Sequence, residues 1–184
     1  MKAVIDGLAP DRGLYFPQEK VILSKEFIES IKNIDDVEIC FEVINKYIGD
    51  EIPKQKLIEI IENTISFKIP LRKIGDSIYS LELFHGPTLA FKDIGAKFMA
   101  QCLDYFKSSY SSKKITVLVA TSGDTGGAVA KGFSGTKDIE VCILYPKGKI
   151  SKVQERQITT NGDYVKAIEV EGDFDKCQSM VKKA

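Results

Sequence analysis

The chain has 184 residues, enough for one ordinary domain or two small ones that bury roughly 70% of the unfolded surface. Basic and acidic residues both number 26, so the formal net charge is zero and no global field attracts nucleic acid or an anionic membrane. No apolar run reaches transmembrane length and the first residues lack a cleavable signal pattern, so we expect a cytoplasmic protein.

Apolar residues at helical spacing dominate the chain from residue 24 to residue 65. Ser24 is placed to cap a first short helix. Either Asp35 or Asp36 opens a second helix, which Gly49 ends. Pro53 opens a third. The apolar stripes of these helices predict a buried core, and we assign them no chemistry.

A β-hairpin is predicted after these helices. Residues 71–84, LRKIGDSIYSLELF, contain two short strands around the turn Gly75-Asp76. The chain then turns again and brings Lys92 to the start of an amphipathic helix, directly after the apolar residue Phe91.

Lys92 is the first candidate site residue. Burial and the positive end of a helix both favour a neutral amine, which is the form that makes a Schiff base. The alternative is a lysine whose stem packs at the helix start while its ammonium stays in water. The residues alone leave both interpretations open.

From residue 115 the pattern changes to alternating strands and helices, after a polar linker at 107–114. The predicted strands are 115–120, 139–146 and 165–172. Such alternation predicts parallel βαβ units in a small open sheet. We therefore expect an α/β fold with a helical N-terminal region and β-hairpin in residues 1–92. A small parallel three-stranded αβ domain follows in residues 93–184.

A second candidate site lies where the first of these strands ends and a helix begins. In open α/β sheets this edge is the usual place for a ligand, and glycines allow backbone N–H groups to approach an anion. Ser122 is the expected N-cap of the helix. The stretch is neither a dinucleotide fingerprint nor a Walker A loop, so a small anion site and a plain tight turn both remain open. The candidate residues are Thr121, Ser122, Gly123, Asp124, Thr125 and Gly126.

Three further residues are candidates. His85 is the only histidine and lies seven residues before Lys92, so it either takes part directly or orients the turn. Lys149 and Arg156 flank the end of the second strand and either bind a substrate phosphate or form an exposed basic helix start. The four cysteines form no CxxC pair, so neither a metal site nor a disulfide framework is predicted.

Several motifs resemble one enzyme family. FHGPTLAFKD, ATSGDTGGAVAKGF and YPKGKISKVQERQ look like the corresponding segments of the threonine synthase family, and GLAPDRGLYFP is similar to its N-terminal signature. The matches run in order from Gly7 to about Gly172 and so cover nearly the whole chain. That family belongs to the fold type II, or tryptophan-synthase-β-like, enzymes that use pyridoxal 5′-phosphate.

The resemblance implies a reaction and roles for the candidate residues. The reaction is the conversion of O-phospho-L-homoserine and water to L-threonine and phosphate. Lys92 would carry the cofactor, with Phe91 beside it, and would move protons on the substrate. The 121–126 loop would hold the substrate carboxylate. Asp124, which replaces the Asn of many relatives, would lie near the phenolic oxygen of the cofactor and tune its electronics.

Two parts of the family pattern are missing. Nothing in the sequence resembles the glycine-rich cradle for the cofactor phosphate or the partner of its pyridine nitrogen, and the chain stops inside a predicted helix at 182–184. We therefore expect the N-terminal part of a longer enzyme, inactive alone. The alternatives are another fold type II lyase, such as threonine dehydratase or cysteine synthase, and a non-catalytic homologue that binds a metabolite. The sequence does not indicate an oligomeric state.

Overall fold

The computed structural model describes residues 2–110 and 114–184 and divides the chain into two compact units, Met1–Ser66 and Phe67–Ala184. The sequence predicted a division after residue 92. The structure groups the hairpin and the segment before Lys92 with the second unit instead. No helix among the described residues is long and apolar enough to cross a membrane.

The first unit is helical, as predicted. Ser24 and Asp35 are the N-caps of the first two predicted helices, and their side chains accept hydrogen bonds from the backbone N–H groups of Phe27 and Glu38. The short helix at residues 2–6 was not predicted, because five residues are too few to show a helical period. The helices of this unit are α1 (Lys2–Asp6), α2 (Lys25–Ser30), η1 (Ile31–Asn33), α3 (Asp36–Ile48), η2 (Gly49–Glu51) and α4 (Lys54–Thr64).

The second unit begins with the predicted hairpin, in which β1 (Leu71–Lys73) pairs antiparallel with β2 (Tyr79–Leu81). Its turn is closed by hydrogen bonds from the N–H groups of Ile74 and Gly75 to the carbonyl oxygen of Ile78. Gly75 and Asp76 lie in the turn between the two strands, as predicted.

The three predicted parallel strands are confirmed, with the order β3-β4-β5. Because strands and helices alternate along the chain as βαβ units require, the small open sheet follows from the local sequence pattern. The elements are α5 (Lys92–Tyr110), β3 (Ile115–Ala120), α6 (Asp124–Gly132), β4 (Ile139–Pro146), α7 (Lys152–Thr159), β5 (Val165–Val170) and α8 (Phe174–Val181).

Strand β5 ends at Val170 and not at residue 172 as predicted. Two helix boundaries also differ from the predictions. Helix α5 continues to Tyr110, into the stretch expected to be a linker, whose residues 111–113 lie outside the described residues. Helix α8 ends at Val181 with Lys182 as its C-cap, so residues 182–184 lie beyond the helix, whereas the sequence predicted that they belong to it. Both boundaries fall in polar stretches, where no apolar period marks the end of a helix.

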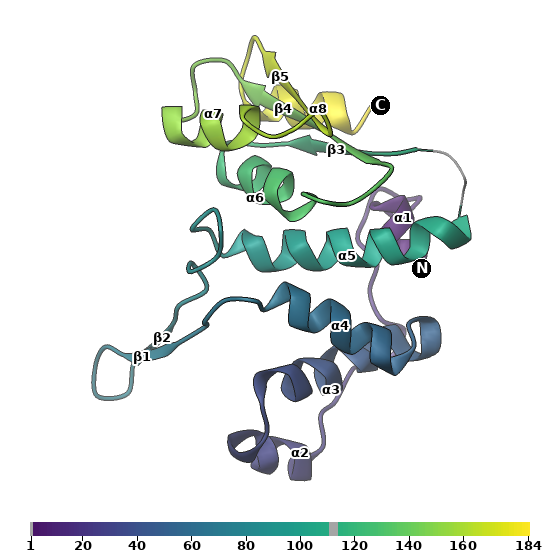
Figure 1. Cartoon of the computed structure of the whole chain (residues 1–184), viewed down its shortest axis with the longest axis vertical. Helices are drawn as coiled ribbons and strands as arrows, with labels where there is room; N and C mark the ends of the chain where they lie inside the picture. The colour runs from purple at the N-terminus through teal and green to yellow at the C-terminus, as the bar shows by residue number, and fades with distance from the viewer. Residues whose placement is uncertain (1, 111–113) are drawn as a thin grey trace. The chain divides into compact units, whose positions relative to one another are not determined.

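The sheet has a core on each face. Leu144 of β4 packs with Val170 and Cys177 on the side of α8. Ile143, the next residue along β4, points the other way and approaches α6 at Gly126. Helix α6 lies between the sheet and α5 (Figure 1). A Cβ atom on Gly132 of α6 would lie 2.9 Å from the backbone of α5, so this glycine permits the close packing that places α5.

Candidate active site

Lys92 is the first residue of α5, and the turn before it is fixed by the next residue, Asp93. The Asp93 side chain is 3% exposed and accepts hydrogen bonds from the backbone N–H of Thr88, at 2.9 Å, and from the Thr88 hydroxyl. A Cβ atom on Gly86 would lie 2.5 Å from Asp93 Oδ2, so only glycine fits there. Residues 86–91 are therefore tied to the start of the helix that carries Lys92.

Lys92 lines a cavity of about 570 Å³. Its Nζ atom is 4.8 Å from the centroid of the Phe91 ring, and Phe91 is 61% exposed. The walls are mostly apolar, and α5 and α6 supply most of them. The lining residues are Leu83, Phe91, Lys92, Ile94, Gly95, Ala96, Met99, Thr125, Ala128 and Val129.

Another nucleophile of α5, Cys102, is not available for chemistry. Cys102 is 3% exposed, and burial raises the pKa of its thiol to about 11. The thiolate is therefore scarce near neutral pH. Lys92, by contrast, is half-buried and lines the cavity.

The 121–126 loop differs from the prediction at its cap. Ser122 is exposed, and the N-cap of α6 is Gly123, with φ 138° and no capping side chain. The hydroxyl oxygen of the fully buried Thr121 accepts the N–H groups of Gly123, at 2.9 Å, and Gly126, at 2.8 Å. The Thr121 hydroxyl, one residue before Ser122, therefore accepts the backbone N–H groups that the Ser122 hydroxyl was expected to accept.

The same geometry defines what the start of α6 offers to a ligand. The first four N–H groups of a helix have no partner inside it. Here the N–H of Gly126 is bound by Thr121 and that of Gly127 by the carbonyl oxygen of Gly123. Within the described residues, this leaves the N–H groups of Asp124 and Thr125 for an anion, and Thr125 lines the cavity that contains Lys92.

Asp124 has a specific partner that the sequence did not indicate. Its Oδ1 atom accepts a hydrogen bond of 2.8 Å from the side-chain amide of Gln154 on α7. Gln154 also completes a capping box with Ser151 at the start of α7. The Ser-x-x-Gln spacing of that box is visible in the sequence, whereas the contact with Asp124 joins residues 30 positions apart.

The remaining candidates are not brought to the cavity. His85 Nε2 lies 2.8 Å from Glu82 Oε2, and the His85 ring packs on Phe84 with 4.8 Å between centroids. Lys149 and Arg156 are both exposed. The described residues that form the cavity wall include none of these three.

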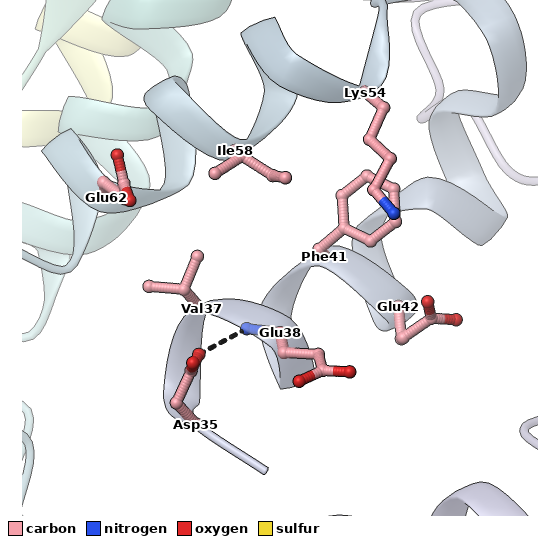
Figure 2. A pocket seen from close by; sticks show the side chains of 8 residues that line it. All are labelled: Asp35, Val37, Glu38, Phe41, Glu42, Lys54, Ile58 and Glu62. Carbon is pink, nitrogen blue, oxygen red and sulfur yellow. Dashed lines mark hydrogen bonds between the residues drawn. The ribbon is translucent and has the colours of Figure 1, made fainter.

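A further cavity, of about 380 Å³, lies between α3 and α4 within the first unit (Figure 2). Acidic side chains line it together with Lys54, whose Nζ atom lies 5.0 Å from the centroid of the Phe41 ring. Asp35 caps α3, so its carboxylate already has a backbone partner. The features of this cavity are explained by the helix pair, and we assign it no chemistry.

Comparison with known proteins identifies the family. The family model for the threonine synthase N terminus matches residues 1–65, and the model for pyridoxal-phosphate dependent enzymes matches residues 60–184. Threonine synthase of Buchnera aphidicola (subsp. Baizongia pistaciae) is 47% identical over 184 residues, which are 100% of this chain and 43% of that protein. The Escherichia coli enzyme is 43% identical over 183 residues, which are 100% of this chain and 42% of that protein.

Solved structures agree. The crystal structure of threonine synthase from Escherichia coli superposes with a TM-score of 0.91 and 43% identity, over 100% of this chain and 42% of that one. The crystal structure of pyridoxal-phosphate-bound threonine synthase from Brucella melitensis superposes with a TM-score of 0.88 and 38% identity, over 99% of this chain and 40% of that one. The chain thus spans less than half the length of these relatives. It belongs to the pyridoxal-phosphate dependent enzyme family, in which it matches the N-terminal part of threonine synthases.

Proposed function

We propose that this chain is the N-terminal part of a pyridoxal-phosphate-dependent threonine synthase, which converts O-phospho-L-homoserine and water to L-threonine and phosphate. The observation that carries the proposal is that Lys92 lines an apolar cavity together with Thr125, in the first turn of α6. The sequence similarity over the whole chain supports the choice of reaction.

The described residues fit this cofactor. A cavity of about 570 Å³ with apolar walls suits a flat aromatic ring, and a lysine amine is the group that binds its aldehyde. When bound, pyridoxal phosphate supplies the electron sink that makes protons next to the substrate amine removable. Phe91, next to Lys92, adds an aromatic face to the wall.

The residues of this chain have different roles in the proposed reaction. Lys92 would hold the cofactor and would move protons at the α and β carbons of the substrate. The N–H groups of Asp124 and Thr125 hold the substrate carboxylate. Thr121 does not touch the ligand in this scheme, because its hydroxyl oxygen maintains the loop. The carboxylate of Asp124 would tune the charge near the cofactor.

The role of Lys92 is tested by reduction of the full-length protein with borohydride in the presence of pyridoxal phosphate. Peptide mass mapping is expected to find the cofactor on the peptide that contains Lys92, and Lys92→Ala is expected to abolish this label without loss of fold. Lys97, five residues later on the same helix, provides a matched control as Lys97→Ala. A label on another lysine would refute the assignment.

The substrate is tested separately. The full-length protein is expected to release phosphate and form threonine from O-phospho-L-homoserine. Formation of 2-oxobutanoate from threonine, or of cysteine from O-acetylserine and sulfide, would instead identify another lyase of the same fold.

A further inference from the structure

Two glutamines of α7 face the two candidate loops. Gln154 and Gln157 are three residues apart, so they project from the same side of the helix. The side-chain amide of Gln154 donates to Asp124 Oδ1 at 2.8 Å. The side-chain amide of Gln157 donates to the carbonyl oxygen of Thr88 at 3.3 Å. One helix face therefore contacts both the loop that starts α6 and the turn that precedes Lys92.

The orientation of the Gln154 amide is fixed by its own helix. Its oxygen accepts a hydrogen bond of 2.9 Å from the backbone N–H of Ser151, as part of the capping box. The nitrogen of the amide is thereby directed to Asp124 as a donor. A glutamate at this position would accept from Ser151 equally well but has no donor for Asp124.

Helix α6 and its N-cap leave room for both glutamines. A Cβ atom on Gly123 would overlap the side-chain amide of Gln154. A Cβ atom on Gly127 would lie 3.1 Å from Gln157 Oε1. Because these two glycines lack side chains, the amides of α7 lie directly against the first turn of α6.

Further hydrogen bonds connect Thr88 to the residue next to Lys92. Thr88 donates both its backbone N–H and its hydroxyl to the buried carboxylate of Asp93, which is the neighbour of Lys92. A continuous set of hydrogen bonds therefore runs from Gln157 through Thr88 and Asp93 to the start of α5. Gln154 makes the equivalent connection to Asp124 in a single step.

We propose that Gln154 and Gln157 are positioning residues, through which α7 sets the spacing between the amine of Lys92 and the loop at the start of α6. The assignment rests on the proposed function, because that function makes these two segments the parts of one active site. Neither glutamine is a catalytic residue. Their effect on the reaction passes through Asp124 and Thr88.

The first test measures order in the two segments and needs no turnover. Hydrogen–deuterium exchange is followed in the full-length protein for peptides that cover residues 86–91 and 121–127. Gln154→Glu is expected to speed exchange in 121–127 only, because two facing carboxylates repel. Gln157→Met keeps the length of the side chain but removes the donor, and is expected to speed exchange in 86–91. Unchanged exchange in both variants would overturn the proposal.

A double variant tests whether the hydrogen bond between positions 124 and 154 can be restored. Asp124→Asn combined with Gln154→Glu places an amide donor at position 124 opposite a carboxylate acceptor at position 154, so the same hydrogen bond forms with its roles reversed. Exchange in 121–127 is expected to return toward that of the unchanged protein. Gln178→Glu, an exposed site on α8, makes the same charge change away from the loops and is expected to alter neither segment. Failure of the rescue would overturn the pairing of Gln154 with Asp124.

The second test separates positioning from a merely structural role. Gln154→Glu is expected to raise the KM for O-phospho-L-homoserine about tenfold, the effect of losing one hydrogen bond to a charged group, and to shift the absorbance of the bound cofactor. A lower Tm with unchanged KM and spectrum would show that Gln154 is only structural. If the unchanged protein binds no cofactor and forms no threonine, the proposed function fails, and the exchange measurements still decide whether α7 orders the two segments.

Discussion

The residue with the greatest consequence for Lys92 is its neighbour Asp93. Sequence reasoning treats an acidic residue in the first turn as a helix-starting residue and no more. In the structure its carboxylate is buried and holds Thr88, and Gly86 packs against it. The turn Gly-Pro-Thr-Leu-Ala-Phe is thus shaped by a side chain that follows it, so the position of Lys92 depends on a buried carboxylate as well as on the residues of the turn.

Replacing Asp93 is expected to destabilise the protein. Asp93→Ala leaves the N–H and hydroxyl of Thr88 without their acceptor, which costs about 2–3 kcal/mol for partly buried hydrogen bonds to a charged group. Urea unfolding of the full-length protein measures the change. Asp104→Ala on the same helix is the control, because its ion pair with Lys107 is partly exposed and contributes about 0–1 kcal/mol. Equal losses in the two variants would contradict the role given to Asp93.

At the scale of elements, most of the fold is local and was predicted. The caps at Ser24 and Asp35, the hairpin and the three parallel strands follow from short patterns that the chain satisfies with neighbouring residues. The sequence also indicates both parts of the candidate site, Lys92 and the 121–126 loop, and their specific roles remain predictions. The sequence does not indicate the hydrogen bond by which α7 contacts the turn before Lys92, because Gln157 and Thr88 are 69 residues apart and no local pattern joins them.

Helix α5 provides a test in which stability and binding change in opposite directions. Gly95 lies in the first turn of this helix and lines the cavity with Lys92, and a Cβ atom there would have no neighbour within 4 Å among the described residues. Gly95→Ala is expected to raise the unfolding free energy by about 0.5–1 kcal/mol, since alanine favours the helix. The added methyl group occupies space at the cavity wall, so affinity for pyridoxal phosphate is expected to fall.

The measurements are urea unfolding without cofactor and a titration with pyridoxal phosphate. Ala100, buried on the same helix and outside the cavity wall, offers the contrasting change Ala100→Gly, which is expected to lower stability without acting on the cavity directly. A stabilised Gly95→Ala protein with unchanged cofactor affinity would show that the cavity beside Lys92 does not hold the cofactor.

At the scale of the whole molecule, the chain contains some parts of the proposed active site, and for the other parts its sequence shows no matching motif. Lys92 and the loop at the start of α6 are present, whereas nothing in the 184 residues resembles a glycine-rich cradle for the cofactor phosphate. That phosphate carries about two negative charges and needs several backbone donors. The relatives are more than twice as long, which agrees with a site completed by further polypeptide.

The isolated 184-residue chain is therefore expected neither to retain pyridoxal phosphate nor to make threonine. A Schiff base on Lys92 alone hydrolyses readily, and each missing charge-assisted hydrogen bond to the phosphate costs about 1.5–3 kcal/mol. The isolated chain and the full-length protein are loaded with cofactor, dialysed and assayed with O-phospho-L-homoserine side by side, after circular dichroism has verified that the isolated chain is folded. A folded chain that keeps its yellow colour and forms threonine would mean that residues 1–184 contain the whole active site, and the division of labour proposed for them would be wrong.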